Sequence, residues 1–267
     1  MRIRYAAKTD VGMKRTHNED YFSLIEDEQL FLVADGMGGH ASGEVASKMA
    51  ADVIQEFFTR SKDEEATWPY KLDRHLSYVE NRLVVGIKMA NQRIFQAASK
   101  EVKLKGMGTT IVSGQVVGDK FYIAHVGDSR CYLVRDGRAR IITRDHTIAA
   151  EQVRLGILSV AEAIESPNRH LLNRSVGNDL IVNVEIDEVQ VQKGDLLLQC
   201  SDGLHGSVLP EDIASILTRF GVLSTAGERL VELANQRDGK DNISVQLIRV
   251  HDVERTGMYR GRPYNLR

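Results

Sequence analysis

The sequence predicts an α+β fold, a layered sandwich of helices and strands in a single domain. Helices with wide apolar faces come in pairs, and short β-branched runs come in clusters. Strands therefore do not alternate one-for-one with helices, as a doubly wound parallel sheet would require. The sequence contains no internal repeat, low-complexity linker or Pro/Ser-rich boundary. The expected organisation is one domain over residues 1–250 and a flexible, arginine-rich tail over residues 251–267.

The first hundred residues predict three strands and two helices. Strands are expected over residues 3–8, 21–25 and 30–34, with the last two paired across an acidic turn. A helix over residues 43–60 is predicted by a wide apolar face. Its members recur every fourth position and are Val45, Met49, Val53 and Phe57, with Ala46, Ala50, Ile54 and Phe58 beside them. After a connector over residues 61–77, the same period predicts a second helix: Leu83, Ile87, Ala90 and Ile94.

The middle of the chain predicts an antiparallel sheet of consecutive hairpins. Four short β-branched or aromatic runs between residues 109 and 143 are separated by Gly-Asp, Gly-Asp-Ser and Asp-Gly turns. Strands flank Asp136-Gly137 closely on both sides, so we interpret it as a type I′ turn without a catalytic role. Residues 145–180 are less regular. They hold one short helix that ends at Leu155 and a second that a capping box opens at Ser159.

The last third of the chain predicts the second helix pair. Strands are expected over residues 181–184 and 195–200. Helices follow over residues 210–221, where a proline suits the first turn, and over residues 226–235. A final strand over residues 243–250 completes the expected sandwich.

Composition argues against several classes of function. The 35 basic and 37 acidic residues give a formal charge of −2, so no strong field would recruit nucleic acid or a membrane surface. Cys131 and Cys200 each lie in an apolar run, and we interpret them as small buried hydrophobes in a reducing compartment. The N-terminus has no apolar stretch of signal-peptide length, and no run of about 18 apolar residues predicts a membrane span. A cytoplasmic protein is expected.

Acidic residues stand where the predicted strands begin or end. If these strands belong to a packed pair of sheets, their ends meet at one edge and the carboxylates point into one cleft. The positions are Glu19 and Asp20 before a strand, Asp35, Asp128 and Asp202 after strands, and Asp241 shortly before the last strand. Like charges at such distances repel, and burial adds a desolvation cost, so the cluster would protonate unless cations neutralised it.

The ligand atoms of this cluster predict the metal and the reaction. All are oxygen atoms, which selects Mg²⁺ or Mn²⁺ over zinc or copper. Two such ions roughly 3.5–4 Å apart, bridged by a carboxylate, would lower the pKa of a shared water and polarise an oxyanion. The residues therefore predict hydrolysis of a phosphate ester.

Each single acidic signal has a structural alternative. Asp-Gly is a common hairpin turn and occurs four times in the chain. At residues 35–36 and 202–203 a helix or an irregular loop follows, so the hairpin explanation fails there. The stretch VADGMGGH (33–40) lacks the Lys-Ser/Thr of a nucleotide-binding loop, and its acid would repel a phosphate. The case for a metal site therefore depends on the whole set of acids.

Three other side chains are candidates for the chemistry. His40 and His17 flank the acidic motifs and could transfer a proton. Arg15 stands four residues before Glu19, where it could hold a phosphate in a bidentate fork. His125 lies inside a predicted strand, and we interpret it as a core or interface residue.

Several segments occur in an order and with gaps that match a known family. They are RTHNED (15–20), VADGMGGH (33–40), GTT (108–110), HVGDSR (125–130), TRDH (143–146), LLNRSVG (171–177), SDGL (201–204) and KDNISV (240–245). Together they resemble the metal-dependent protein phosphatases of the PPM or type 2C family, in their bacterial form. The resemblance covers about residues 3–250, and several matches in order are far more specific than any single one.

The resemblance implies a four-layer α-β-β-α sandwich, with two antiparallel sheets flanked by helix pairs and a metal cleft at one end. It implies that Asp35 bridges two Mn²⁺ or Mg²⁺ ions. Gly36 would offer its carbonyl oxygen to one ion, and a bulkier residue there could block that approach. Asp202 and Asp241 would hold the other ion directly.

The family also implies roles for the remaining acids and for the arginine. Glu19 and Asp20 would bind metal or orient its waters. Asp128, together with Asp202, matches the site of a weaker third metal in bacterial members. Arg15 would bind the substrate phosphate. The implied reaction is attack on phosphorus by a metal-bridged water, without a phospho-enzyme.

One position departs from the family pattern. Many eukaryotic members place a histidine directly after the Asp-Gly pair as the proposed general acid, but this chain has Met37 there. The acid is therefore open among His40, His17 and a water on the third metal. Residues 145–180 correspond to the family's variable flap beside the cleft, where we expect substrate choice.

The expected function is Mn²⁺- or Mg²⁺-dependent hydrolysis of phosphoserine and phosphothreonine on proteins. The partners would be phosphoproteins, namely Ser/Thr kinases and their substrates, and a monomer is expected. Within enzymes, the alternatives are a small-molecule phosphoesterase and a metal nuclease, and the near-neutral charge argues against the nuclease. A catalytically inactive phosphoprotein-binding module is the alternative from another class. The presence of Asp35, Asp202 and Asp241 argues against it.

Overall fold

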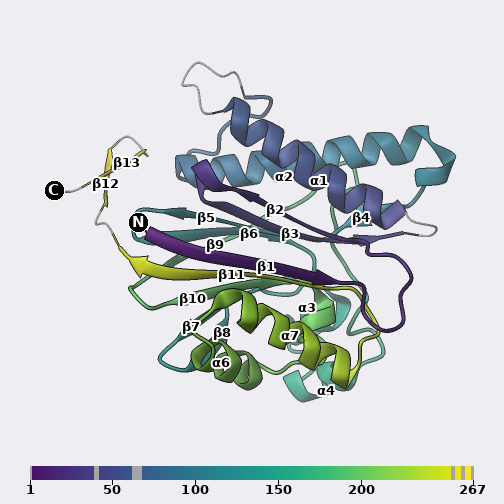
Figure 1. The fold of residues 1–267 in the computed structure, drawn as a ribbon. Coiled ribbons are helices and arrows are strands. Elements are labelled where there is room, and N and C mark those ends of the chain that lie inside the picture. Colours follow the sequence, from purple (N-terminus) through teal and green to yellow (C-terminus); the bar gives the residue numbers. More distant parts are fainter. Residues whose placement is uncertain (1, 39–41, 62–67, 254–255, 260–261, 266–267) are drawn as a thin grey trace.

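The computed structural model describes residues 2–38, 42–61, 68–253, 256–259 and 262–265. Within these residues two antiparallel sheets pack face to face, and helices cover their outer faces (Figure 1). The first sheet has the order β1 (Arg2–Asp10), β11 (Ile243–Asp252), β10 (Leu196–Cys200), β7 (Arg130–Arg135) and β8 (Arg138–Ile141). The second has the order β2 (Asp20–Ile25), β3 (Leu30–Met37), β5 (Ile111–Val117), β6 (Lys120–Val126) and β9 (Glu185–Gln190), and β4 (Gly108–Thr109) pairs with β3. The predicted α-β-β-α sandwich is confirmed.

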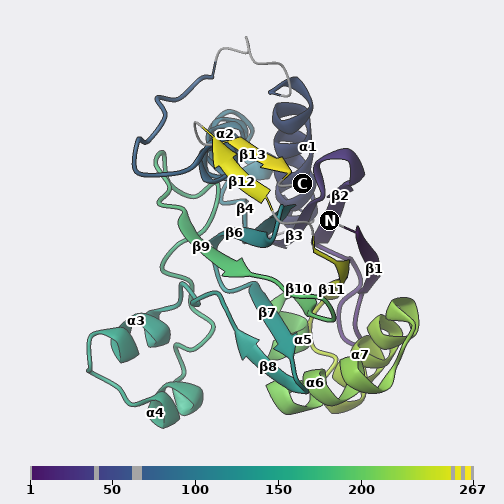
Figure 2. The same ribbon diagram turned by 90° about the vertical axis from the view of Figure 1, so that its left-hand side faces the viewer.

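The helices form the outer layers and one projection. The second sheet carries α1 (Ser42–Arg60) and α2 (Tyr78–Lys100), and the first carries α5 (Asp202–His205), α6 (Pro210–Arg219) and α7 (Leu223–Arg237). Two short helices, α3 (Ile148–Arg154) and α4 (Val160–Glu165), stand away from the sandwich (Figure 2). Single 3-10 turns occupy Glu26–Glu28 and Val102–Leu104.

Three apolar cores hold these layers together. One lies between the second sheet and α1 and α2, one between the first sheet and α5, α6 and α7, and one between the two sheets. The stripe that α1 buries runs through Ala46, Ala50 and Ile54, whereas Val45 is exposed. These buried residues belong to the wide apolar face that the sequence predicts, and Val45 lies at its edge.

The expectation of consecutive hairpins in one sheet is wrong at residues 127–129. The chain leaves the second sheet after β6 and enters the first sheet at β7, so this segment crosses between the sheets. Gly127 has a φ of 105°, and a side chain there would come within 2.6 Å of Thr110. The crossing thus places Asp128 between the sheets instead of on a hairpin tip. The turn at Asp136-Gly137 has positive φ at both residues, which confirms the type I′ prediction.

The strand expected over residues 181–184 is also wrong, because the ladder begins four residues later. β9 pairs with β6 from Glu185, opposite His125, to Gln190. Ile181 is 78% exposed and belongs to the segment that returns from α4 to the sheet. β9 is an edge strand whose inward positions include Glu185 and Asp187. Its sequence therefore lacks the apolar alternation from which a strand is predicted.

Two further expectations concern the ends of the described chain. The tail over residues 251–267 contains the end of β11 and a hairpin of β12 (Thr256–Tyr259) with β13 (Arg262–Asn265), which neither large sheet includes. Its flexibility and the domain boundary at residue 250 stay predictions.

Across the ranges that the structure describes, no helix has the length and hydropathy to cross a bilayer. Cys131 and Cys200 are buried free thiols.

Candidate metal centre

Asp20 and Asp35 are neighbours on the second sheet. Asp20 opens β2, Asp35 lies near the end of β3, and the two are register partners. Asp20 is buried, and the Ser201 hydroxyl donates to its Oδ2 atom over 2.7 Å. Burial raises the pKa of Asp20 from 3.8 to about 7. Burial and the neighbouring acids, Asp20 first among them, raise the pKa of Asp35 well above its ordinary value.

Asp202 and Asp128 reach the same place from the first sheet and from the crossing segment. Asp202 opens α5 two residues after the last residue of β10, and its carboxyl group interacts electrostatically with that of Asp35. Burial, and then the charge of Asp241, raise the pKa of Asp202. Asp128 is 6% exposed, and burial, with the charge of Asp202, raises its pKa to about 8. Four strand ends thus converge on one acidic cluster.

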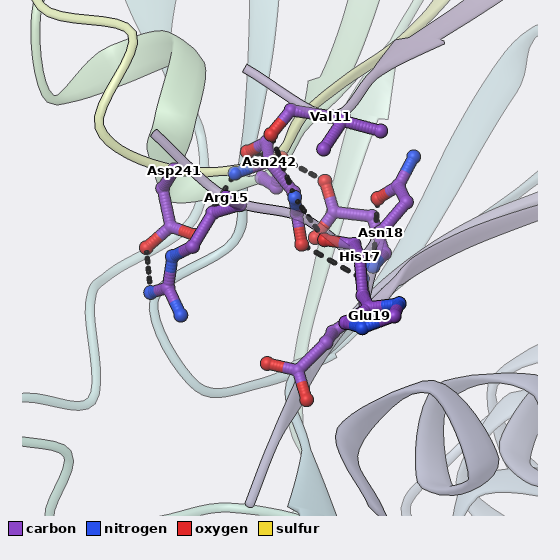
Figure 3. A network of polar contacts seen from close by, with 9 residues as sticks. Val11, Arg15, His17, Asn18, Glu19, Asp241 and Asn242 are labelled. Carbon is purple, nitrogen blue, oxygen red and sulfur yellow. Dashed lines mark hydrogen bonds and ion pairs between the residues drawn. The ribbon is translucent and has the colours of Figure 1, made fainter. Parts of the chain in front are cut away.

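Asp241 and Arg15 form the outer rim of the cluster. Arg15 Nη2 donates to Asp241 Oδ2 over 2.8 Å, and both side chains are partly exposed (Figure 3). This bond leaves the other guanidinium N–H groups of Arg15 available beside the acids. The structure therefore places the predicted phosphate-binding arginine next to the predicted metal ligands.

Asn242 is a central residue that was not singled out in the sequence. Its Nδ2 atom donates to the carbonyl oxygens of Val11 and His17, each over 2.9 Å, and its Oδ1 atom accepts the Glu19 N–H over 2.7 Å (Figure 3). The side chain is 3% exposed. Asn242 therefore fastens the loop that carries Arg15 to the start of β11. In the sequence, Asn242 stands within the KDNISV segment, between an acid and an apolar strand.

Glu19 and Gly36 lie where β3 approaches the N-terminus of α1. Burial raises the pKa of Glu19 above its ordinary value. A Cβ on Gly36 would lie 2.1 Å from the Gly43 carbonyl oxygen, and one on Gly43 would lie 2.6 Å from Glu19 Oε1. The absence of side chains at these two glycines therefore allows α1, β3 and the Glu19 carboxylate to come into close contact. The predicted carbonyl ligation by Gly36 stays a prediction.

Two threonines that the sequence analysis did not select hold Asp35 in place. Thr109 Oγ1 donates to the Asp35 carbonyl oxygen over 2.9 Å, and the Asp35 N–H donates to Thr110 Oγ1 over 3.2 Å. Both threonines are buried. They belong to the GTT segment, whose matching position was the only sign of this role.

Among the described residues, no hydrogen bond joins the side chain of the candidate His17 to the acidic cluster. His17 is exposed, and its contact is the carbonyl oxygen that accepts from Asn242. His40 lies outside the described residues. Met37 is half-buried at the end of β3. A different histidine, His205, is hydrogen-bonded at Nε2 to the Asp128 carbonyl oxygen over 2.9 Å, and burial lowers its pKa to about 3.

The chemistry of the donor set fits hard divalent cations. The converging carboxyl groups raise one another's pKa, and binding a divalent cation relieves this repulsion. A separate group of His125, His146 and Glu185 has ligand atoms within 4.8 Å of one another. In that group, however, His146 Nδ1 already accepts a hydrogen bond from the Gly127 N–H over 3.0 Å. The acidic cluster is therefore the better candidate for a cation site.

Comparisons with known proteins agree with this geometry. The family described as Protein phosphatase 2C matches residues 13–237. The chain is 35% identical over 263 residues to the serine/threonine phosphatase Stp of Listeria innocua, covering 96% of this chain and 97% of the relative. The solved S. agalactiae serine/threonine phosphatase has a TM-score of 0.82 at 33% identity, covering 94% of this chain and 100% of that one.

A second solved structure connects this fold with metal. It is the catalytic domain of the serine/threonine protein phosphatase PstP in complex with two manganese ions. It has a TM-score of 0.78 at 32% identity, and the match covers 94% of this chain and 99% of that one. From the sequence match, the shared fold and the acidic cluster, we conclude that the chain belongs to the protein phosphatase 2C family.

Proposed function

We propose that the protein removes phosphate from phosphoserine and phosphothreonine residues of other proteins with the help of Mn²⁺ or Mg²⁺. The observation that carries this proposal is the convergence of Asp20, Asp35, Asp128 and Asp202 at one end of the sandwich. Relatives named serine/threonine phosphatases, and a neighbouring structure named with two manganese ions, support it.

We assign the cation ligands to the residues of the cluster. Asp35 would hold both of two inner ions, Gly36 would offer its carbonyl oxygen to one of them, and Asp202 and Asp241 would hold the other. When bound there, Mn²⁺ or Mg²⁺ supplies Lewis-acid chemistry, making water a stronger nucleophile at neutral pH and polarising the phosphate. Asp128, with Asp202, would form an outer site.

The residues around the cluster would orient the reactants. The Ser201 hydroxyl donates to Asp20, which would fix the orientation of this carboxyl group within the acidic cluster. Glu19, on the loop that Asn242 fixes, would orient waters beside it. Arg15 lies on the rim, where its remaining N–H groups can bind the phosphate oxygens of an incoming side chain.

The proton donor for the leaving group is proposed to be His40, with His17 as the competing candidate. Met37 carries no proton that it could transfer at the position of the family histidine. His40→Ala and His17→Ala should be compared on aryl phosphates with good and poor leaving groups. Loss of the general acid slows the hydrolysis of substrates with poor leaving groups selectively. If a substitution slows both kinds of substrate equally, the substituted histidine is therefore not the general acid.

The proposed partners are phosphoproteins, including Ser/Thr kinases, which a cytoplasmic, monomeric phosphatase would oppose. The near-neutral formal charge of −2 gives no reason to expect nucleic acid as a substrate.

The test of this function is hydrolysis of a phosphoserine peptide and of an aryl phosphate with Mn²⁺, with chelator, and with Asp202→Asn. We expect turnover of both substrates with Mn²⁺ and nearly complete loss with chelator or with the variant. Turnover of the aryl phosphate alone would favour a small-molecule phosphoesterase. Peptide binding without turnover would favour the inactive module, and chelator-resistant turnover would contradict the metal-dependent mechanism.

A further inference from the structure

The crossing segment that carries Asp128 is fixed on two sides by residues next to other members of the acidic cluster. Ser129 Oγ shares a hydrogen bond with Thr110 Oγ1 over 2.6 Å, and the same threonine oxygen accepts the Asp35 N–H. The Asp128 carbonyl oxygen is bonded to His205 Nε2 over 2.9 Å, three residues after Asp202. These contacts fix the position of the crossing segment relative to Asp35 and Asp202.

A third attachment comes from the first residues of the flap. His146 N–H donates to the Gly127 carbonyl oxygen, and the Gly127 N–H donates to His146 Nδ1, both over 3.0 Å. His146 is 5% exposed. One residue of the flap thus holds both polar groups of the glycine that directly precedes Asp128.

The hydrogen bonds assign the tautomer of His146. Because Nδ1 accepts from Gly127, the ring proton lies on Nε2, which donates to Glu185 Oε2 over 3.1 Å. Arg174 Nη1 lies at the same distance from Nε2, but it has no acceptor capacity, and it donates to the Asn183 carbonyl oxygen over 3.3 Å. Burial lowers the pKa of His146, which favours the neutral ring. Both nitrogens are therefore engaged, and the ring cannot turn without losing a bond.

The same residue also joins the two ends of the flap. The His146 carbonyl oxygen accepts the Asn173 N–H over 3.0 Å, where the chain returns from α4. The preceding residue, Asp145, accepts two hydrogen bonds from Arg130, over 2.9 and 2.7 Å. The base of the flap and the segment from Gly127 to Arg130 therefore form one bonded unit.

We propose that His146 is a positioning residue for the outer cation site, whose neutral Nδ1 atom couples the base of the flap to Asp128. This inference rests on the proposed assignment of Asp128 as a cation ligand. Residues that orient ligands in this indirect way typically change metal affinity by about 10- to 100-fold when replaced. Altering the flap base should therefore change cation binding at Asp128 and leave the inner ions unaffected.

Two substitutions separate the bonds of the ring. His146→Asn places an amide oxygen near the position of Nδ1 and can still accept from Gly127, but it cannot reach Glu185. His146→Gln reaches Glu185 but places no acceptor beside Gly127. Glu185→Ala is the matched control, because it removes the partner that His146→Asn cannot reach. Asp128→Asn defines which step of Mn²⁺ binding belongs to the outer site.

Mn²⁺ binding is measured by titration calorimetry, and exchange of the Gly127 amide proton is measured by NMR. With His146→Gln we expect the Asp128-dependent step to weaken by about 10- to 100-fold and the Gly127 amide to exchange faster. With His146→Asn and Glu185→Ala we expect both quantities to stay close to those of the unsubstituted protein. Equal weakening by His146→Gln and His146→Asn would overturn the proposal. So would faster Gly127 exchange in His146→Gln without any change in Mn²⁺ binding.

The ring tautomer gives a test that needs no variant. In the unsubstituted protein, nitrogen chemical shifts should show the His146 proton on Nε2, and a proton on Nδ1 would overturn the proposal. If Asp128→Asn removes no Mn²⁺-binding step, Asp128 is not a cation ligand and the proposal fails, although peptide hydrolysis can continue. If instead peptide hydrolysis is absent, the proposed function fails, and the comparison of Mn²⁺ binding still decides the role of His146.

Discussion

The two ends of the space between the sheets are built from opposite kinds of side chain. One end is apolar and fully buried, with Phe31, Phe121 and Ile248. The other end collects Asp35 and Asp202, whose pKa values burial raises. One strand contributes side chains of both kinds: β3 has Phe31 and, four residues later, Asp35 on its inward face. The apolar end stabilises the fold, and the acidic end destabilises it in return for a place to bind cations.

The largest expected effect follows from neutralising one acid of the acidic end. Asp35→Asn should lower phosphatase turnover by about a thousandfold or more, because it removes the carboxylate proposed to bridge the two ions and with it several kcal/mol of charge stabilisation. The same variant should raise the free energy of unfolding in chelator, since it relieves repulsion within the cluster. Activity assays and urea denaturation check both parts.

Asp136→Asn is the matched control, because Asp136 also precedes a glycine but belongs to the type I′ turn. It should leave both activity and stability nearly unchanged. A lower free energy of unfolding for Asp35→Asn in chelator would contradict the claim that the acidic end destabilises the fold.

The opposite pattern is expected at the apolar end. Phe121→Ala should lower the free energy of unfolding by about 3–5 kcal/mol, because Phe121 is fully buried and its ring fills the space over Gly114. The folded fraction should keep the Mn²⁺ affinity of the unsubstituted protein. Urea denaturation and calorimetry test this, and a large loss of Mn²⁺ affinity would show that the ends are coupled.

Above about pH 6.5 the pH dependence of stability should report mainly on the acidic end, because the buried histidines, whose pKa values are lowered, are neutral there in both the folded and the unfolded state. In chelator, the folded pKa values of Asp20 and Asp128 are about 7 and about 8, against an ordinary value of 3.8. At these two residues the folded state binds more protons than the unfolded state, so the free energy of unfolding should fall as the pH rises from about 6.5 to about 8. Saturating Mn²⁺ should remove this decline. A stability that is constant or rises over this range in chelator would contradict the assigned burial.

A smaller effect is expected at the exposed rim. Arg15→Ala should lower kcat/KM by about 10- to 100-fold, the value of one or two charge-assisted hydrogen bonds to phosphate. Arg15→Lys should recover only part of it, since lysine keeps the charge but loses the fork. Arg60→Ala on the outer face of α1 is the control, and an equal loss there would remove Arg15 from the site.

Much of this arrangement could be predicted because strand ends are local signals. Apolar runs followed by acids located Asp35, Asp128 and Asp202, and the periodic segments located α1 and α2. The grouping of helices and strands predicted a layered α+β sandwich, the family resemblance implied its two antiparallel sheets, and the structure confirms both.

The rest depends on bonds between residues far apart in the chain. Asn242 accepts a hydrogen bond from Glu19, which lies 223 residues earlier in the chain. The sequence around either residue does not predict that bond. The crossing at Gly127 was mistaken for a hairpin because a turn sequence does not reveal which sheet the next strand joins. His146 stands within the TRDH segment, but its role depends on the direction of one ring nitrogen, which the sequence does not reveal.

The most direct test of the acidic end is anomalous diffraction at the manganese edge from crystals of the protein grown with Mn²⁺. We expect the strongest peaks among Asp35, Asp202 and Asp241, with a weaker peak beside Asp128. Peaks at His125, His146 and Glu185 instead, with none among the acids, would contradict the account.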